Sequence, residues 1–97
     1  MTIEKLLQNN EGTIVDVRTP HEYQGGHVTG SINIPVSELH GRLDELKNFQ
    51  QPLILCCASG GRSSMASHLL KQQGLNCVDA GSWLSLNHLQ SKTVDIL

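Results

Sequence analysis

The sequence has few aromatic residues and no long apolar run. One Phe, one Tyr and one Trp occur among 97 residues, so we expect a core built from aliphatic side chains. No apolar run approaches the roughly 20 residues that a membrane-spanning helix needs, which argues against a membrane partner. The first residues also lack the apolar core of a signal peptide. We therefore expect a cytoplasmic protein.

An excess of charge of either sign is missing as well. Seven Lys and Arg residues stand against nine Asp and Glu residues, which gives a formal net charge of −2. This balance supplies neither the basic surface that binds nucleic acid non-specifically nor a basic patch for a membrane surface. We expect no nucleic acid and no membrane among the partners.

Cysteine is scarce and unevenly placed. There are three cysteines, and two of them, Cys56 and Cys57, are adjacent. An odd number with two neighbours makes a poor disulfide framework and favours a reducing compartment with one working thiol. The five histidines are scattered and form no Cys/His cluster, so we predict no metal site and no cofactor.

Short apolar segments alternate along the chain with segments of helical periodicity. Strands are expected at residues 13–17, 31–34, 53–56 and 76–79. Helices are expected at residues 2–10, at 38–47 with Ser37 as its cap, at 63–73, and from residue 81 onward. This alternation predicts an α/β fold with a small parallel sheet flanked by helices on both faces. The length suits a single domain covering residues 1–97.

The segment from Leu53 to Ser64 combines an apolar strand, a tight loop and the start of a helix. Its loop begins with the thiol of Cys57, ends with the guanidinium of Arg62, and has only small residues between them. Such a loop lets backbone N–H groups turn inward beside a helix N-terminus, which favours an anion. We expect the Cys57 thiol to have a lowered pKa and to act as a nucleophile in an open, shallow pocket. The expected substrate-binding residues are Ala58, Ser59, Gly60, Gly61, Arg62 and Ser63.

The loop sequence at residues 57–63, CASGGRS, resembles the active-site loop of the rhodanese family of sulfurtransferases. A second stretch, VDVRTPHEY at residues 15–23 followed by GHVTGSINIP at 26–35, is similar to the family's N-terminal signature. Residues 79–83 resemble its C-terminal motif, with Ser82 in place of the second glycine. The resemblance implies that Asp16 and Arg18 tie loops together and that Arg62 has a supporting role.

The resemblance also implies a thiosulfate sulfurtransferase cycle. The Cys57 thiolate attacks the outer sulfur of a donor such as thiosulfate, sulfite leaves, and a persulfide remains on Cys57. A thiophilic acceptor, such as cyanide or a thiol, then removes that sulfur. The implied partners are small sulfur donors, thiol acceptors and a sulfur-accepting protein.

Two alternatives remain open at this point. Five residues separate Cys56 from Arg62, the spacing of cysteine-dependent phosphatases and arsenate reductases, whereas four separate Cys57 from Arg62, the sulfurtransferase spacing. We favour Cys57 because Cys56 continues the apolar strand and no aspartate is an obvious general acid. The second alternative is a persulfide carrier or regulatory rhodanese-like module that does not turn over.

Overall fold

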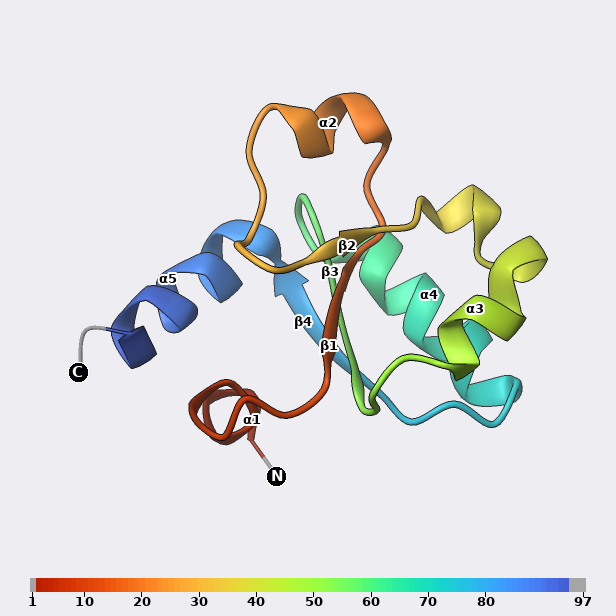
Figure 1. The fold of residues 1–97 in the computed structure, drawn as a ribbon. Coiled ribbons are helices and arrows are strands. Elements are labelled where there is room, and N and C mark those ends of the chain that lie inside the picture. Colours follow the sequence, from red (N-terminus) through yellow and green to blue (C-terminus); the bar gives the residue numbers. More distant parts are fainter. Residues whose placement is uncertain (1, 95–97) are drawn as a thin grey trace.

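The computed structural model describes residues 2–94 (Figure 1). Its strands are β1 (Thr13–Asp16), β2 (Ile32–Asn33), β3 (Leu53–Cys57) and β4 (Cys77–Ser82). Its α-helices are α1 (Ile3–Gln8), α2 (Pro20–Gln24), α3 (Leu43–Lys47), α4 (Gly61–Gln72) and α5 (Trp83–Val94). Two short 3₁₀ turns, η1 (Val36–Glu38) and η2 (His40–Arg42), precede α3. No helix within residues 2–94 combines the length and the apolar character needed to cross a membrane.

The four strands form one parallel sheet with the order β2-β1-β3-β4. After β1 the chain adds β2 on one side, and then crosses to the other side of β1 to add β3. The direction of winding therefore reverses between β1 and β3. In parallel α/β sheets the crevice at the carboxyl ends of two such strands is the usual place for a ligand.

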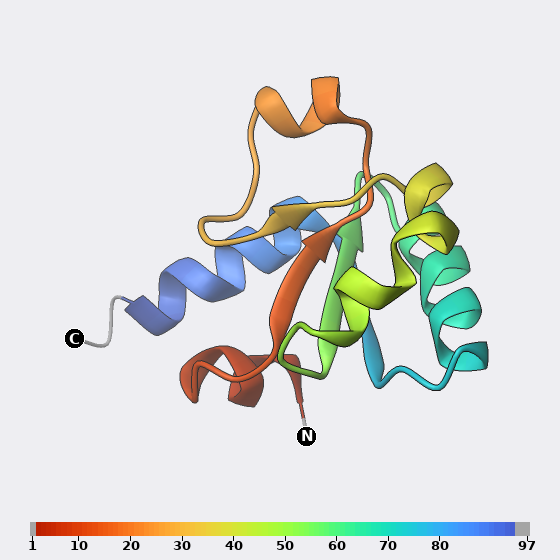
Figure 2. The same ribbon diagram turned by 45° about the vertical axis from the view of Figure 1, so that its right-hand side comes forward.

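The core consists of two clusters, one on each face of the sheet, and alternate side chains of β3 contribute to each. Leu53, Leu55 and Cys57 join the cluster that includes Leu46 of α3 and Leu70 of α4. Ile54 and Cys56 join the cluster that includes Leu6 of α1 and Leu86 of α5. Successive residues of a strand point to opposite faces, so one short apolar run serves both clusters. Figures 1 and 2 show α3 and α4 on one side of the sheet and α1 and α5 on the other, which confirms the predicted α/β architecture.

The segment at 38–47 differs from the expected single helix. It forms η1, η2 and α3 in succession, Ser37 lies inside η1, and no side-chain cap is present there. Gly41 sits in the middle of the segment, and glycine weakens a helix interior because it loses more backbone entropy than other residues. The leucine spacing also predicts Leu39, Leu43 and Leu46 facing inward. Leu39 and Leu46 are fully buried, and Leu43 is partly buried and packs against the core.

The helical spacing of residues 63–73 predicts Met65, Ala66, Leu69 and Leu70 on one inner face of α4, and Met65 departs from it. Met65 is 59% exposed, whereas Ser63, Ala66 and Leu70 are buried. One residue corresponds to about 100° of rotation in a helix with 3.6 residues per turn. Met65 is therefore turned out of the face that Ala66 presents to the sheet.

Candidate active site

Cys57 is the last residue of β3, at the carboxyl edge of the sheet beside β1. The loop that follows is closed by Gly60, whose φ of +105° lies in the left-handed region that glycine adopts without a steric penalty. Gly60 is the N-cap of α4, so the first turn of this helix faces the strand end. Figure 1 shows the α2 segment arching beyond the same edge of the sheet.

The sulfur of Cys57 accepts hydrogen bonds from backbone amides of the loop. The amide of Gly60 lies 3.0 Å from Sγ and the amide of Ser63 lies 3.4 Å from it. The Ser63 hydroxyl is a third partner, with its Oγ 3.5 Å from Sγ. Burial alone raises the pKa of the Cys57 thiol, but the hydrogen bonds from Ser63 and Gly60 outweigh this and hold that pKa below its ordinary value.

The burial of Cys57 differs from the open, shallow pocket expected from the small loop residues. Its side chain is only 1% exposed, although Ala58, Ser59 and Gly61 around it are exposed. The physical reason is that the amides of the loop fold over the sulfur to hydrogen-bond it. A reacting molecule must therefore bring a slender group down to Sγ.

Cys56 is buried on the opposite face of β3. Burial, and next the charge of Asp16, raise the pKa of its thiol to about 12. A thiol with that pKa is almost wholly protonated at neutral pH and is a weak nucleophile. This environment argues against the phosphatase-like alternative, which requires Cys56 as the reacting residue.

Asp79 is a contact of the loop that the sequence reasoning missed as a site residue. Its Oδ1 accepts hydrogen bonds from the Ser63 hydroxyl at 2.7 Å and from the amide of Gly81 at 3.0 Å. The pairing of β3 with β4 skips Ala80 at this point, so a bulge lies beside Asp79. The available signal was the position of Asp79 at the end of a strand that neighbours β3.

Arg62 is engaged by a carboxylate from a distant segment. Its Nη1 lies 2.6 Å from Oε1 of Glu22, and its Nη2 lies 3.0 Å from Oε2. The hydrogen bonds from Arg62, and next those from Thr19, lower the pKa of the Glu22 carboxyl to about 2. The pair is therefore ionised at neutral pH and joins the start of α4 to α2.

Asp16 and Arg18 form a second, buried pair at the end of β1. Arg18 donates from Nε to Oδ1 of Asp16 at 2.9 Å and from Nη2 to Oδ2 at 2.7 Å. The same Nη2 donates to the carbonyl of Gly26 at 2.7 Å. The Asp16 hydrogen bond, the largest of several effects, raises the pKa of Arg18. This geometry ties the segment that carries α2 to the sheet.

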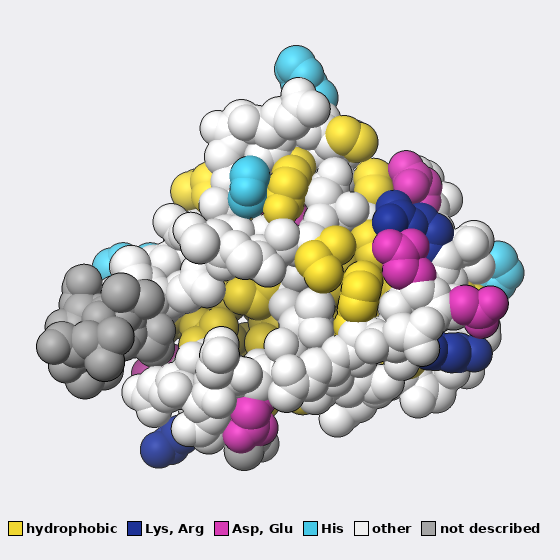
Figure 3. Space-filling view, viewed as in Figure 1, with side chains coloured by type: hydrophobic (Ala, Val, Ile, Leu, Met, Phe, Trp, Pro, Cys, Tyr) yellow, Lys and Arg dark blue, Asp and Glu magenta, His cyan; other side chains and the backbone are white. Residues whose placement is uncertain are grey.

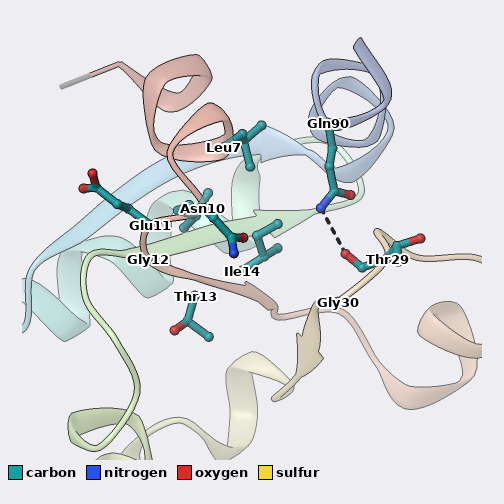
Figure 4. Close-up of a pocket in the computed structure, with 10 residues that line it drawn as sticks. Leu7, Asn10, Glu11, Gly12, Thr13, Ile14, Thr29, Gly30 and Gln90 are labelled. Carbon is teal, nitrogen blue, oxygen red and sulfur yellow. Dashed lines mark hydrogen bonds between the residues drawn. The ribbon is translucent and has the colours of Figure 1, made fainter. Parts of the chain in front are cut away.

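A cavity of about 180 Å³ lies at the amino end of the sheet, away from the Cys57 loop (Figure 4). Its lining includes Leu7 of α1, Ile14 of β1 and Gln90 of α5, and the Gln90 side chain donates to the carbonyl of Thr29 at 3.1 Å. None of residues 57–64 lines it. Among the described residues, no group of three or more His, Cys, Asp and Glu side chains is arranged to hold a metal ion.

Comparison with known proteins places this geometry in a family. The model of the rhodanese-like domain family matches residues 2–84. The chain is 35% identical over 74 residues to thiosulfate sulfurtransferase GlpE of Pseudoalteromonas translucida, covering 76% of this chain and 70% of that protein. It is 36% identical over 75 residues to the putative sulfur carrier protein YrkF of Bacillus subtilis, covering 77% of this chain and 40% of that protein.

A solved structure agrees with these sequence relatives. The rhodanese-related protein of Thermoplasma volcanium has a TM-score of 0.75 and 35% identity, covering 90% of this chain and 87% of that one. The chain spans about half or less of the length of three curated relatives that it matches, at 48%, 40% and 26%. The family match and the shared fold lead to one conclusion: the chain belongs to the rhodanese-like domain family.

Proposed function

We propose that this protein is a sulfurtransferase that carries sulfane sulfur as a persulfide on Cys57. The observation that carries the proposal is the pair of amides of Gly60 and Ser63 directed at the Cys57 sulfur, 3.0 and 3.4 Å away. Hydrogen bonds to a sulfur anion favour the thiolate, which is the nucleophilic form of cysteine. The sulfur stands at the carboxyl end of a central strand, where parallel sheets bind ligands.

The proposed reaction has two steps. In the first, the Cys57 thiolate attacks the sulfane sulfur of thiosulfate or a related donor, one S–S bond forms as another breaks, and the donor leaves with the electron pair. In the second, a nucleophilic acceptor such as a thiol or cyanide attacks the outer sulfur of the Cys57 persulfide and restores the thiolate. The inward amides of the loop stabilise the anionic sulfur in both steps.

The loop residues have separate roles in this proposal. Ala58, Ser59 and Gly61 leave the approach to the sulfur free of bulk, because all three are small and exposed. Gly60 and Ser63 donate to sulfur, and Arg62 shapes the loop through Glu22. The partners are small sulfur donors, thiol acceptors and a sulfur-accepting protein. We also propose a cytoplasmic location, because the three cysteines are free and buried.

A persulfide carrier that does not turn over is the second candidate. It is favoured by the likeness to YrkF, a protein named as a putative sulfur carrier. Both candidates load Cys57 in the same way and differ only in the second step. Multiple turnovers with a small acceptor identify an enzyme, whereas a single loading event without turnover identifies a carrier.

Intact-protein mass after incubation with a sulfane-sulfur donor tests the proposal. We expect the mass to increase by one sulfur atom in the natural protein and in Cys56→Ser. The Cys57→Ser variant is expected to gain none. Loading that persists in Cys57→Ser but is lost in Cys56→Ser would assign the chemistry to the other cysteine.

A further inference from the structure

The cation of the loop is already neutralised. Arg62 is the single Lys or Arg among residues 57–64, and both ends of its guanidinium face the Glu22 carboxylate at 2.6 and 3.0 Å. The low pKa of the Glu22 carboxyl, about 2, keeps this pair intact at neutral pH. The nearby Arg18 is likewise held by Asp16, its Nη2 lying 2.7 Å from Oδ2. Neither guanidinium is left to balance a charged substrate.

The groups that remain around the sulfur add negative charge. The carboxylate of Asp79 is close to Cys57, because the Ser63 hydroxyl contacts both the Asp79 carboxylate and the Cys57 sulfur. The thiolate itself is the second anion. The side chains of Ala58 and Ser59 carry no charge, and the two residues after them are glycines. An incoming dianion thus meets net negative charge, offset only by the partial charges of the loop amides.

Donors of sulfane sulfur differ in how well they fit this environment. Thiosulfate is a dianion, and its outer sulfur is bonded directly to a sulfonate with three oxygens. An organic persulfide carries at most one charge on its reacting group, and its outer sulfur stands at the end of a slender S–CH₂ chain. The 1% exposure of Cys57 favours the slender donor, and the neutralised Arg62 favours the donor of lower charge.

We infer that the site takes its sulfur from an organic persulfide in preference to thiosulfate, and that Glu22 sets this preference by neutralising Arg62. The inference rests on the proposed function. In the loading step, Cys57–S⁻ attacks the outer sulfur of R–S–SH, the S–S bond of the donor breaks, and R–S⁻ departs with the electron pair. The product is Cys57–S–SH, so atoms, charge and the proton balance without another reactant.

The rate of sulfur loading, measured by intact-protein mass, compares the two donors. The probes are thiosulfate and 2-hydroxyethyl persulfide, whose carbon chain is uncharged. In the natural protein we expect the second-order loading constant to be at least about tenfold higher for the persulfide. A Glu22→Gln variant should lower the ratio of the persulfide loading constant to the thiosulfate loading constant about tenfold, which corresponds to the strength of one charge-assisted hydrogen bond. Glutamine also retains the capping box that Glu22 forms with Thr19.

The matched control is Glu45→Gln. Glu45 holds Arg42 by two contacts of 2.8 Å, so this variant also removes a carboxylate from an arginine, which keeps its second partner Glu38 at 3.1 Å. Figure 3 shows basic and acidic side chains side by side over the segment that contains Arg42 and α3. That pair lies outside the loop, and we expect both loading constants to stay unchanged in this variant.

Each other outcome counts against a defined part of the inference. Equal loading of the natural protein from both donors would overturn the donor preference, and this comparison needs no variant. A persulfide preference that Glu22→Gln leaves as it was would remove Glu22 from the explanation. No loading of Cys57 from either donor would instead overturn the proposed function.

Discussion

The guanidinium carbon of Arg18 lies 4.6 Å from the centroid of the Trp83 ring. The same arginine donates to the carbonyl of Gly26 at 2.7 Å, and a Cβ added at Gly26 would lie 3.0 Å from Cη2 of Trp83. Arginine, tryptophan and glycine therefore form one contact that closes the α2 segment over the end of β1. A cation above an aromatic face adds an electrostatic attraction to this packing.

A side chain at position 26 should disturb that contact. We expect Gly26→Ala to lower the free energy of unfolding by about 1–3 kcal/mol, because the methyl group collides with Trp83 and the φ of +153° is strained for alanine. Urea denaturation followed by the fluorescence of Trp83, the single tryptophan, measures the change. The control is Gly41→Ala, where an added Cβ meets nothing within 4 Å. Equal losses in both variants would contradict this explanation.

Removing one member of the buried Asp16–Arg18 ion pair should lower the free energy of unfolding more than Gly26→Ala does. Asp16 is completely buried and Arg18 is 4% exposed, so Asp16→Ala leaves a guanidinium without its charged partner inside the protein. We expect a loss of about 3–5 kcal/mol in the free energy of unfolding. Glu45→Ala removes one of two partners of the partly exposed Arg42 and should leave stability nearly unchanged. Denaturant titrations of the two variants provide the comparison, and similar losses would argue against a stabilising role of the buried pair.

The Ser63 hydroxyl should contribute to the low pKa of Cys57. Ser63→Ala removes the hydroxyl beside Sγ, a contact that lowers the pKa of the Cys57 thiol, so the titration of Cys57 should move to higher pH. At neutral pH the thiolate fraction, and with it the rate of sulfur loading, should then fall. The ultraviolet absorbance of the thiolate as a function of pH reports the shift. The exposed neighbour Ser64 supplies the control, since Ser64→Ala should leave the titration in place; a shift of equal size there would exclude a specific role for Ser63.

The cysteines should differ sharply in reactivity. A small alkylating agent at neutral pH is expected to modify Cys57 first, because the pKa of the Cys57 thiol is lowered and burial raises the pKa values of Cys56 and Cys77. Peptide mapping after brief treatment identifies the modified residue. In denaturant, all three should react at similar rates. Preferential modification of Cys56 in the folded protein would be incompatible with the environments described above.

The fold and the position of Cys57 were predictable because their signals are local. Short apolar runs, a small-residue loop and a helical periodicity lie next to one another at residues 53–73. The partners of that loop were harder to find, since Glu22 lies 40 residues from Arg62 and Asp79 lies 16 residues from Ser63. Such pairs depend on how the strands are ordered in the sheet, which a linear pattern does not specify. The single helix predicted at residues 38–47 was wrong for a different reason. The regular spacing of the leucines favoured one helix, and this signal was given more weight than the helix-weakening effect of Gly41.

The central place of β3 has a consequence for how the protein folds. Its partners come from far along the chain, since Leu53 pairs with Thr13 on one side and with Cys77 on the other. Contacts of long sequence separation form late and slowly in folding. We therefore expect the amides of Gly60 and Ser63 to be held against the Cys57 sulfur only in the folded sheet, and nascent or partly unfolded chains to expose a thiol of ordinary pKa. Sulfur loading can accordingly serve as a reporter of complete folding.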